Sequence, residues 1–429
     1  MAKSEKGKTV RLSGYDELDG MRVPESWLPK AENIGGGFFV NDGVLVEYKG
    51  KADRVIIPEG VTAIEDGALR GKSFAAVVIP ASLTVVRPQA FRYCRYLEKL
   101  EVADGHPTFH VDGNCLIDTK KKTLVMGLNN SFIPTGDGVT KIGKSAFAAN
   151  GWGRRDNNFI PENITEIGAN AFAGCGVLDV VVPSSVKKLG KGAFASCDYL
   201  KTVVIEDGLT AISDEAFAYC ECLTSVRLPQ SVKTIGKKAF FMCQKLADIN
   251  IPTGLVDIGY AAFCWCNGWC DGLDGDLVVP KTLKLGLASF PCASINSITV
   301  EDGNPYYYSQ DNCLIEKDTK TLVLGCKSSV IPYGVKRIGS HAFYYASGLK
   351  SATIPDSVEE IGENAFRFCK DLESVVIPDS VKEIGKDAFV CKEEFWDKTA
   401  LGRVTMPKRF AERDDLFDED NTIEFKLTD

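Results

Sequence analysis

The sequence predicts an α/β repeat solenoid, a curved right-handed coil in which short parallel strands form a sheet on the concave face. Three observations predict it. A unit of 22 or 23 residues recurs along most of the 429-residue chain, its strand commonly ends at a proline, and one phenylalanine occupies the same place in nearly every unit. A unit of this size cannot bury its own apolar face, so units must stack. We expect about 13 coils in one array.

Each unit begins with a short strand of the pattern Leu-x-x-Val-x-Ile, as in the segment that starts at Leu200. Its period-two alternation is typical of a strand with one buried face. Pro183, Pro229 and Pro252 follow the last buried residue of their units. Because proline has no N–H to donate, it ends the hydrogen-bonded ladder there.

A turn and a short helical segment complete each unit. Glycine follows a second buried Ile or Leu in most units, where it suits either a positive φ or a close backbone approach. An Ala-Phe pair then begins an expected helical or 3-10 segment on the convex side. Phenylalanine fills its slot in eleven of twelve units, from Phe91 to Phe389, and Leu69 fills the first. We expect these rings to form a continuous buried column.

Two longer units interrupt the array and are interpreted as strand–turn–strand hairpins, near residues 103–130 and 301–328. We assign the solenoid to residues 39–407. Residues 1–38 and 408–429 are expected to cap its ends, because uncapped solenoid ends expose apolar surface and open strand edges.

The composition argues against several classes of function. The net charge of −8 leaves no basic surplus for phosphate groups, so nucleic acid is not expected as a partner. No apolar run is long enough to cross a bilayer, and the polar start Met1–Lys8 does not resemble a secretory signal. From the residues alone we expect a cytoplasmic, monomeric protein without membrane insertion.

No catalytic residue and no cofactor are predicted, because no nucleophile, phosphate-binding or paired-carboxylate motif stands out. Seven cysteines recur three residues after the repeat phenylalanine, which indicates a small buried apolar position. Cys264, Cys266 and Cys270 form a dense cluster, and His106 and His110 have a metal-like spacing. A metal protein or enzyme with these ligands is the alternative hypothesis.

Two surfaces are candidates for binding a partner. On the strand face, Arg227, Asp248 and Asn250 alternate with buried residues and are expected to be exposed. Aromatic side chains, which interfaces favour, lie elsewhere, in a bulge made of Tyr306, Tyr307 and Tyr308 with Trp265 and Trp269. The competing interpretation is that these rings pack over the base of the second hairpin.

The motif Ile-Pro-x-Ser-Val-x-x-Ile-Gly-x-x-Ala-Phe-x-x-Cys spans residues 354–369 and recurs closely at 182–197. It resembles the BspA-like class of bacterial leucine-rich repeats, and the resemblance extends from Phe38 to Pro407. This resemblance implies a non-enzymatic scaffold that binds a protein or matrix ligand, often on a bacterial surface. Secretion or surface display is therefore the alternative to a cytoplasmic location, and a passive structural element is the alternative to a specific binder.

Overall fold

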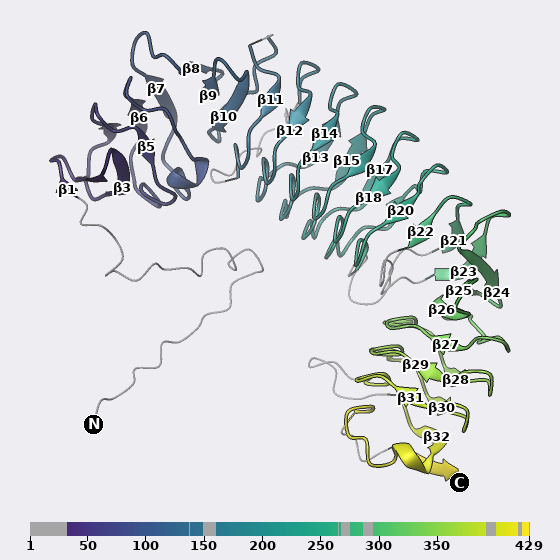
Figure 1. The fold of residues 1–429 in the computed structure, drawn as a ribbon. Coiled ribbons are helices and arrows are strands. Elements are labelled where there is room, and N and C mark those ends of the chain that lie inside the picture. Colours follow the sequence, from purple (N-terminus) through teal and green to yellow (C-terminus); the bar gives the residue numbers. More distant parts are fainter. Residues whose placement is uncertain are drawn as a thin grey trace, which may run out of the picture.

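The computed structural model describes residues 32–136, 138–148, 160–264, 266, 275–285, 295–391, 400–418 and 423–428. Figure 1 shows one curved arc of stacked coils, which runs from the N-terminal end to the C-terminal strand. The predicted curved solenoid is confirmed.

One coil contains a long strand, a loop, a short strand and a turn. In the coil that starts at Leu200, β15 (Thr202–Ile205) is the long strand and β16 (Ala211–Ile212) is the short one. β15 pairs in parallel with the long strands of the coils on both sides, and β16 pairs in parallel with the short strand of the next coil. Each coil therefore adds a strand to two separate sheets.

In the described part of the chain, the long strands form four parallel sheets along the arc. They are β4 (Arg54–Ile56), β6 (Ala76–Ile79), β7 (Lys99–Val102), β13 (Asp179–Val182), β15, β17 (Ser225–Arg227), β19 (Asp248–Ile249), β21 (Gly275–Val279), β23 (Ile295–Val300), β28 (Ser351–Thr353), β30 (Ser374–Val376), β32 (Arg403–Pro407) and β33 (Glu424–Thr428).

The short strands have two residues each, and the second residue points into the core. They are β5 (Ala63–Ile64), β11 (Lys141–Ile142), β12 (Glu166–Ile167), β14 (Lys188–Leu189), β16, β18 (Thr234–Ile235), β20 (Asp257–Ile258), β22 (Lys284–Leu285), β27 (Arg337–Ile338), β29 (Glu360–Ile361) and β31 (Glu383–Ile384).

Antiparallel strands occur where the repeat is interrupted, and both predicted hairpins are confirmed. The first insertion contains β8 (Phe109–Asp112), β9 (Cys115–Asp118) and β10 (Thr123–Gly127), and β10 continues into the short-strand sheet through β11. The second repeats this arrangement with β24 (Tyr307–Gln310), β25 (Cys313–Glu316) and β26 (Thr321–Leu324). A related sheet of β1 (Glu32–Asn33), β2 (Phe38–Asn41) and β3 (Val44–Tyr48) opens the described array.

The expected helical segments are turns. Among the described residues the only helical pieces are two 3-10 segments, η3 (Pro88–Phe91) and η5 (Lys408–Phe410). The turns are hydrogen-bonded from coil to coil, as in the bond of 2.8 Å that the Phe194 N–H donates to the Ala216 carbonyl.

The turns also lie on a different side of the arc from the one expected. Figure 1 shows η3, which carries Phe91, on the inner side of the arc rather than on the convex side. The prediction assumed that bulky helices need more room than strands. Flat turns that bond directly to the next coil need no such room, so they do not force the turn side outward.

The backbone of most described turns is left-handed at two places, two residues before and two residues after the phenylalanine. In the coil of Phe217 these are Glu215, with φ of 56°, and Tyr219, with φ of 62°. The repeat glycine itself has no positive φ. It permits a close approach instead, because a Cβ atom on Gly168 would lie 2.7 Å from the carbonyl carbon of Gly143 in the preceding coil.

Among the described residues, the repeat phenylalanines stack in the core as predicted, but in two runs instead of one continuous column. From Phe147 through Phe172, Phe194, Phe217 and Phe240 to Phe263, neighbouring rings are stacked with centres 4.9 to 5.5 Å apart and planes within 8°. A second stack runs from Phe343 through Phe366 and Phe389 to Phe417. All these rings are buried, so the column is the spine of the solenoid.

Candidate interaction surface

The cysteine column lies beside the phenylalanine column and bonds one coil to the next. The Sγ of Cys197 donates to the Phe172 carbonyl of the preceding coil at 3.2 Å, and Cys220 does the same to Phe194 at 3.1 Å. Burial raises the pKa of the Cys94 thiol to about 11 and that of Cys369 to about 12. A buried, protonated thiol is a poor nucleophile, so this column is part of the structural core.

The candidate metal ligands do not assemble in the described part of the chain. Within it, no three His, Cys, Asp or Glu side chains are grouped to hold a metal ion. The Nδ1 of His106 accepts the N–H groups of Thr108 and Phe109 at 3.0 Å, and His110 is bonded to Thr119 at 2.8 Å.

The cluster of Cys264, Cys266 and Cys270 is not assembled as a metal site in the described part of the chain either. Cys266 donates to the Phe240 carbonyl at 3.2 Å as a member of the buried column, and Cys264 is also buried. Cys270 lies outside the described residues.

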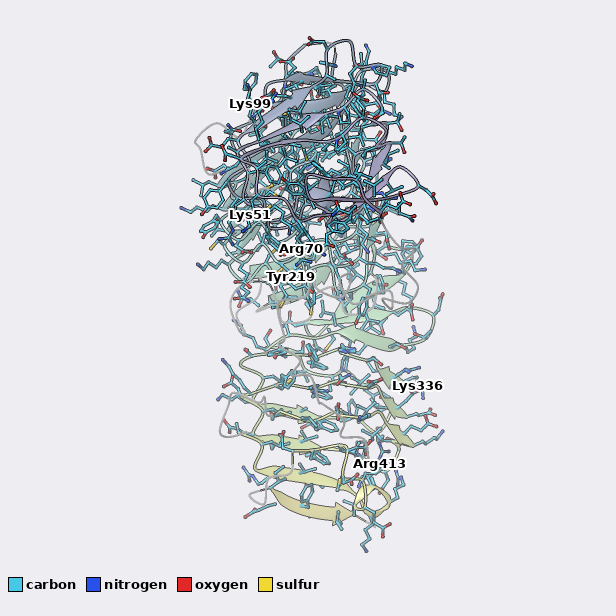
Figure 2. All side chains as sticks on the ribbon, turned by 90° about the vertical axis from the view of Figure 1, so that its left-hand side faces the viewer. Lys51, Arg70, Lys99, Tyr219, Lys336 and Arg413 are labelled. Atoms are coloured by element: carbon cyan, nitrogen blue, oxygen red, sulfur yellow. The ribbon has the colours of Figure 1, made fainter. Side chains whose placement is uncertain are left out.

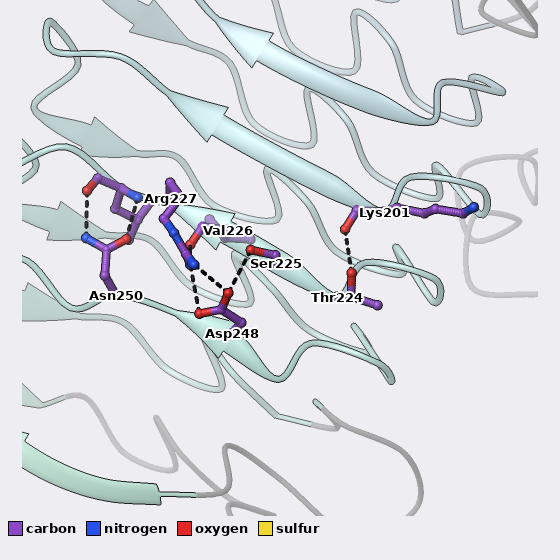
Figure 3. A network of polar contacts seen from close by, with 8 residues as sticks. Lys201, Thr224, Ser225, Val226, Arg227, Asp248 and Asn250 are labelled. Carbon is purple, nitrogen blue, oxygen red and sulfur yellow. Dashed lines mark hydrogen bonds and ion pairs between the residues drawn. The ribbon is translucent and has the colours of Figure 1, made fainter. Parts of the chain in front are cut away.

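The structure brings together Arg227 on β17, Asp248 on the adjacent β19 and Asn250 just after β19 (Figure 3). Arg227 donates to Asp248 at 2.8 Å, and its guanidinium holds the pKa of that carboxyl below its usual range. The amide of Asn250 bonds both the N–H and the carbonyl of Leu228, at 2.8 and 2.7 Å. Any partner that contacts these side chains must compete with bonds that already join the two coils.

The three consecutive tyrosines lie in three different environments. Tyr307 is buried, and its hydroxyl accepts the Leu285 N–H at 3.3 Å. Tyr306 is exposed, with the Lys284 ammonium 5.6 Å from its ring centre, and Tyr308 is half-buried beneath Lys320. Tyr307 is thus a packing residue, whereas Tyr306 is presented to solvent.

The bulge cannot be assembled completely from the described residues. Both of its predicted tryptophans, Trp265 and Trp269, lie outside them. The structure therefore places only the three tyrosines of the five predicted aromatic side chains.

Charged side chains on the short strands, or directly before them, form ion pairs from coil to coil. Glu166 lies 3.5 and 2.6 Å from Lys141 and Lys188. Glu359 lies between Lys336 and Lys382 at 3.3 and 2.6 Å, and hydrogen bonds from these two lysines lower its pKa. In Figure 2, Lys336 projects from one edge of the stack. Exposed pairs of this kind contribute little stability, so this edge is a solvated surface.

The aromatic side chains that the sequence analysis missed lie on the turns. We call Tyr93, Tyr96, Tyr199, Tyr219 and Phe241 the turn-face aromatics. Tyr93, Tyr96 and Tyr199 are 44%, 68% and 53% exposed, and the other two are half-buried. The guanidinium groups of Arg70 and Arg92 lie 5.2 and 4.9 Å from the ring centre of Tyr93, and the rings of Tyr219 and Phe241 meet edge-on at 5.4 Å.

Two of these residues share one position in the turn. Tyr93 and Tyr219 lie two residues after the repeat phenylalanine and have positive φ. In the sequence, the signal was aromatic residues at variable positions next to the repeat Cys. These positions resembled core residues because a helix was expected there.

The stacked coils, the paired parallel sheets and the buried Phe and Cys columns define a repeat protein with an extended surface. A family model described as BspA type Leucine rich repeat region matches residues 47–150, 140–270 and 320–409, in six copies. The chain belongs to this family. Within the described residues, the structure contains no helix that is long and apolar enough to span a membrane.

Several solved structures are similar to this chain. A leucine-rich repeat protein from Eubacterium ventriosum is 22% identical, with a TM-score of 0.50 over 57% of this chain and 66% of its own. One from Bacteroides ovatus is 22% identical over 93% of this chain and 97% of its own, with a TM-score of 0.47. A leucine rich cell surface protein from Faecalibacterium prausnitzii is 21% identical, covers 94% and 96%, and has a TM-score of 0.41. No curated protein matches the sequence.

Proposed function

We propose that the protein is a non-enzymatic scaffold for protein–protein interaction and that its partner contacts the turn-face aromatics. The observation that carries this proposal is the exposure of Tyr93, Tyr96 and Tyr199 on the turns, where Tyr93 lies beside Arg70 and Arg92. Figure 1 shows η3, which opens the turn before Tyr93, on the inner side of the arc. Tyrosine and arginine are enriched at interface hot spots, and solenoids bind through extended concave surfaces.

The strand face has fewer side chains suited to binding than the turns have, and this difference supports the proposal. Its exposed residues include Val181 and Val204, and its charged members Arg227 and Asp248 are paired with each other. This face offers small side chains and satisfied charges, which are weak anchors. Tyr306 is a second candidate contact, because its ring is exposed beside Lys284.

Binding is tested with a partner captured from the native setting and then purified. We expect Tyr93→Ala combined with Tyr199→Ala to weaken its affinity at least about tenfold, because each change removes an exposed aromatic contact. Tyr333→Ala is the matched control, since Tyr333 is 78% exposed but lies in the loop before β27. The proposed surface is wrong if the control weakens binding and the double variant does not.

The remaining alternatives have their own tests. A passive structural element predicts no saturable partner in the same capture experiment. A metal protein predicts stoichiometric metal in protein that was purified without added metal. A cytoplasmic location remains a prediction, with secretion or surface display as its alternative, and fractionation of the native cells distinguishes them.

A further inference from the structure

Within the described residues, the last strand of the solenoid, β33 (Glu424–Thr428), has one unpaired edge. β33 is the last strand of the sheet β28-β30-β32-β33, and among the described residues it pairs only with β32. Phe425 and Leu427 are 47% and 40% exposed, and the charged Glu424 and Lys426 between them are exposed as well. Figures 1 and 2 show this yellow strand at the end of the stack.

The backbone of β33 has hydrogen-bonding groups that face this open edge. The N–H of Glu424 donates to the Gly402 carbonyl at 2.8 Å, on the side of β32. Along a strand, the N–H and C=O of one residue point to the same side, and successive residues alternate. Phe425 and Leu427 therefore direct their backbone groups outward, and by the same alternation so does Ile423.

We propose that a second copy of this chain pairs with this edge in antiparallel orientation, centred on Phe425. In this register Phe425 lies opposite its counterpart, Glu424 lies opposite Lys426 in both directions, and Ile423 lies opposite Leu427. The segment Ile-Glu-Phe-Lys-Leu is thus self-complementary in charge and polarity. Aromatic pairs and opposite charges across antiparallel strands are stabilising.

Backbone geometry and charge select this register. In the proposed pair, the two residues at the centre exchange two hydrogen bonds, so the backbone N–H and C=O of the central residue must point away from β32. Phe425 meets that requirement. Centring on Lys426 would place two ammonium groups opposite each other and turn the wrong backbone groups to the partner. Parallel, in-register stacking would place Glu424 against glutamate and Lys426 against lysine. The proposed contact has two-fold symmetry, so it closes as a dimer and does not extend into a filament.

Sedimentation equilibrium of the full chain, at concentrations up to about 200 µM, tests the proposal. We expect a concentration-dependent dimer. Glu424→Lys and Lys426→Glu should each raise its dissociation constant about tenfold, because symmetry turns both favourable pairs into like-charge pairs. The double variant Glu424→Lys/Lys426→Glu restores opposite charges at both places, so we expect it to recover the original dissociation constant.

A further variant separates pairing from folding. Leu427→Pro removes an outward N–H that β32 does not use, so it should abolish the dimer while circular dichroism and the melting temperature stay unchanged. If the chain is a monomer at every concentration, the proposal is wrong. The alternative is then that an extended segment of another protein pairs with the edge of β33. A dimer that survives both single charge reversals overturns the proposal as well.

Discussion

At the scale of single residues, the fold depends on side chains that make the same contact in every coil. Phe217 stacks on Phe194 and on Phe240, at 5.4 and 5.5 Å. Cys220 donates to a carbonyl of the preceding coil, and Gly168 permits its backbone to approach Gly143. Each residue type is required by a neighbouring coil and not by its own.

Phe217→Ala removes a fully buried ring from the middle of the stack. We expect the free energy of unfolding to fall by about 3–5 kcal/mol, because the ring leaves a cavity between two neighbours that cannot collapse onto it. Urea denaturation measures the loss. Phe132→Ala is the matched control, since Phe132 is 66% exposed, and it should cost less than about 1 kcal/mol. Equal losses of unfolding free energy in the two variants would show that the buried phenylalanine column contributes no more stability than an exposed ring.

The buried thiols predict instability at alkaline pH. The pKa values of Cys115, Cys313 and Cys369 are raised to about 12 by burial, whereas a thiol in the unfolded chain titrates near about 8.5. Below that pH both states keep the proton. Above it only the unfolded state releases the proton, so the free energy of unfolding falls as pH rises toward 12.

Denaturation midpoints between pH 7 and 11 measure this effect. In Cys369→Ala, the slope of unfolding free energy against pH above 9 should be shallower, by up to about 1.4 kcal/mol per pH unit. Lysines and tyrosines also titrate in this range, but they are common to both proteins and cancel in the comparison. Identical slopes would show that the Cys369 thiol ionises equally in both states.

At the scale of elements, the two hairpins divide the core. Strand β9 is buried on both faces, with Leu116 in the N-terminal core and Ile117 in the middle core. Strand β25 separates Leu314 in the middle core from Ile315 in the C-terminal core in the same way. The two hairpin insertions therefore separate neighbouring apolar cores inside the solenoid, and they also extend its surface.

Substitutions in the second hairpin distinguish the two interpretations of its tyrosines, namely a binding surface and rings that pack over the hairpin base. We expect Tyr307→Ser to lower the free energy of unfolding by about 3–5 kcal/mol, because its ring is 4% exposed and fills the core at the start of β24. Tyr306→Ser should cost less than about 1 kcal/mol, since its ring lies at the surface. Thermal and urea denaturation provide the comparison. A larger loss from Tyr306 would reverse the assignment of the two rings.

At the scale of the whole molecule, the described residues of the solenoid form three apolar cores. They extend from Phe38 to Leu128, from Cys115 to Cys326 and from Cys313 to Ile423. Repeat proteins are stabilised by contacts between neighbouring units, so damage in one core should spread through that core first.

Hydrogen exchange on Phe240→Ala tests this division. We expect faster amide exchange in β13, β15, β17 and β19, which line the middle core, while β4 and β6 keep their protection. Phe366→Ala should shift the loss of protection to β28 and β30 of the C-terminal core. If Phe240→Ala accelerates exchange equally in β6, the three cores unfold as a single cooperative unit.

The sequence by itself determined the repeat, the parallel strands, the phenylalanine and cysteine columns and the two hairpins. These features follow from local periodicity, because each coil repeats the same apolar pattern and must bury it against the next. Only the tertiary structure decided that η3 lies on the inner side of the arc, that Tyr307 is buried beside an exposed Tyr306, and that β33 has a single neighbouring strand among the described residues. Those outcomes depend on how neighbouring coils pack and pair their backbones, and this packing leaves no periodic trace in the residues.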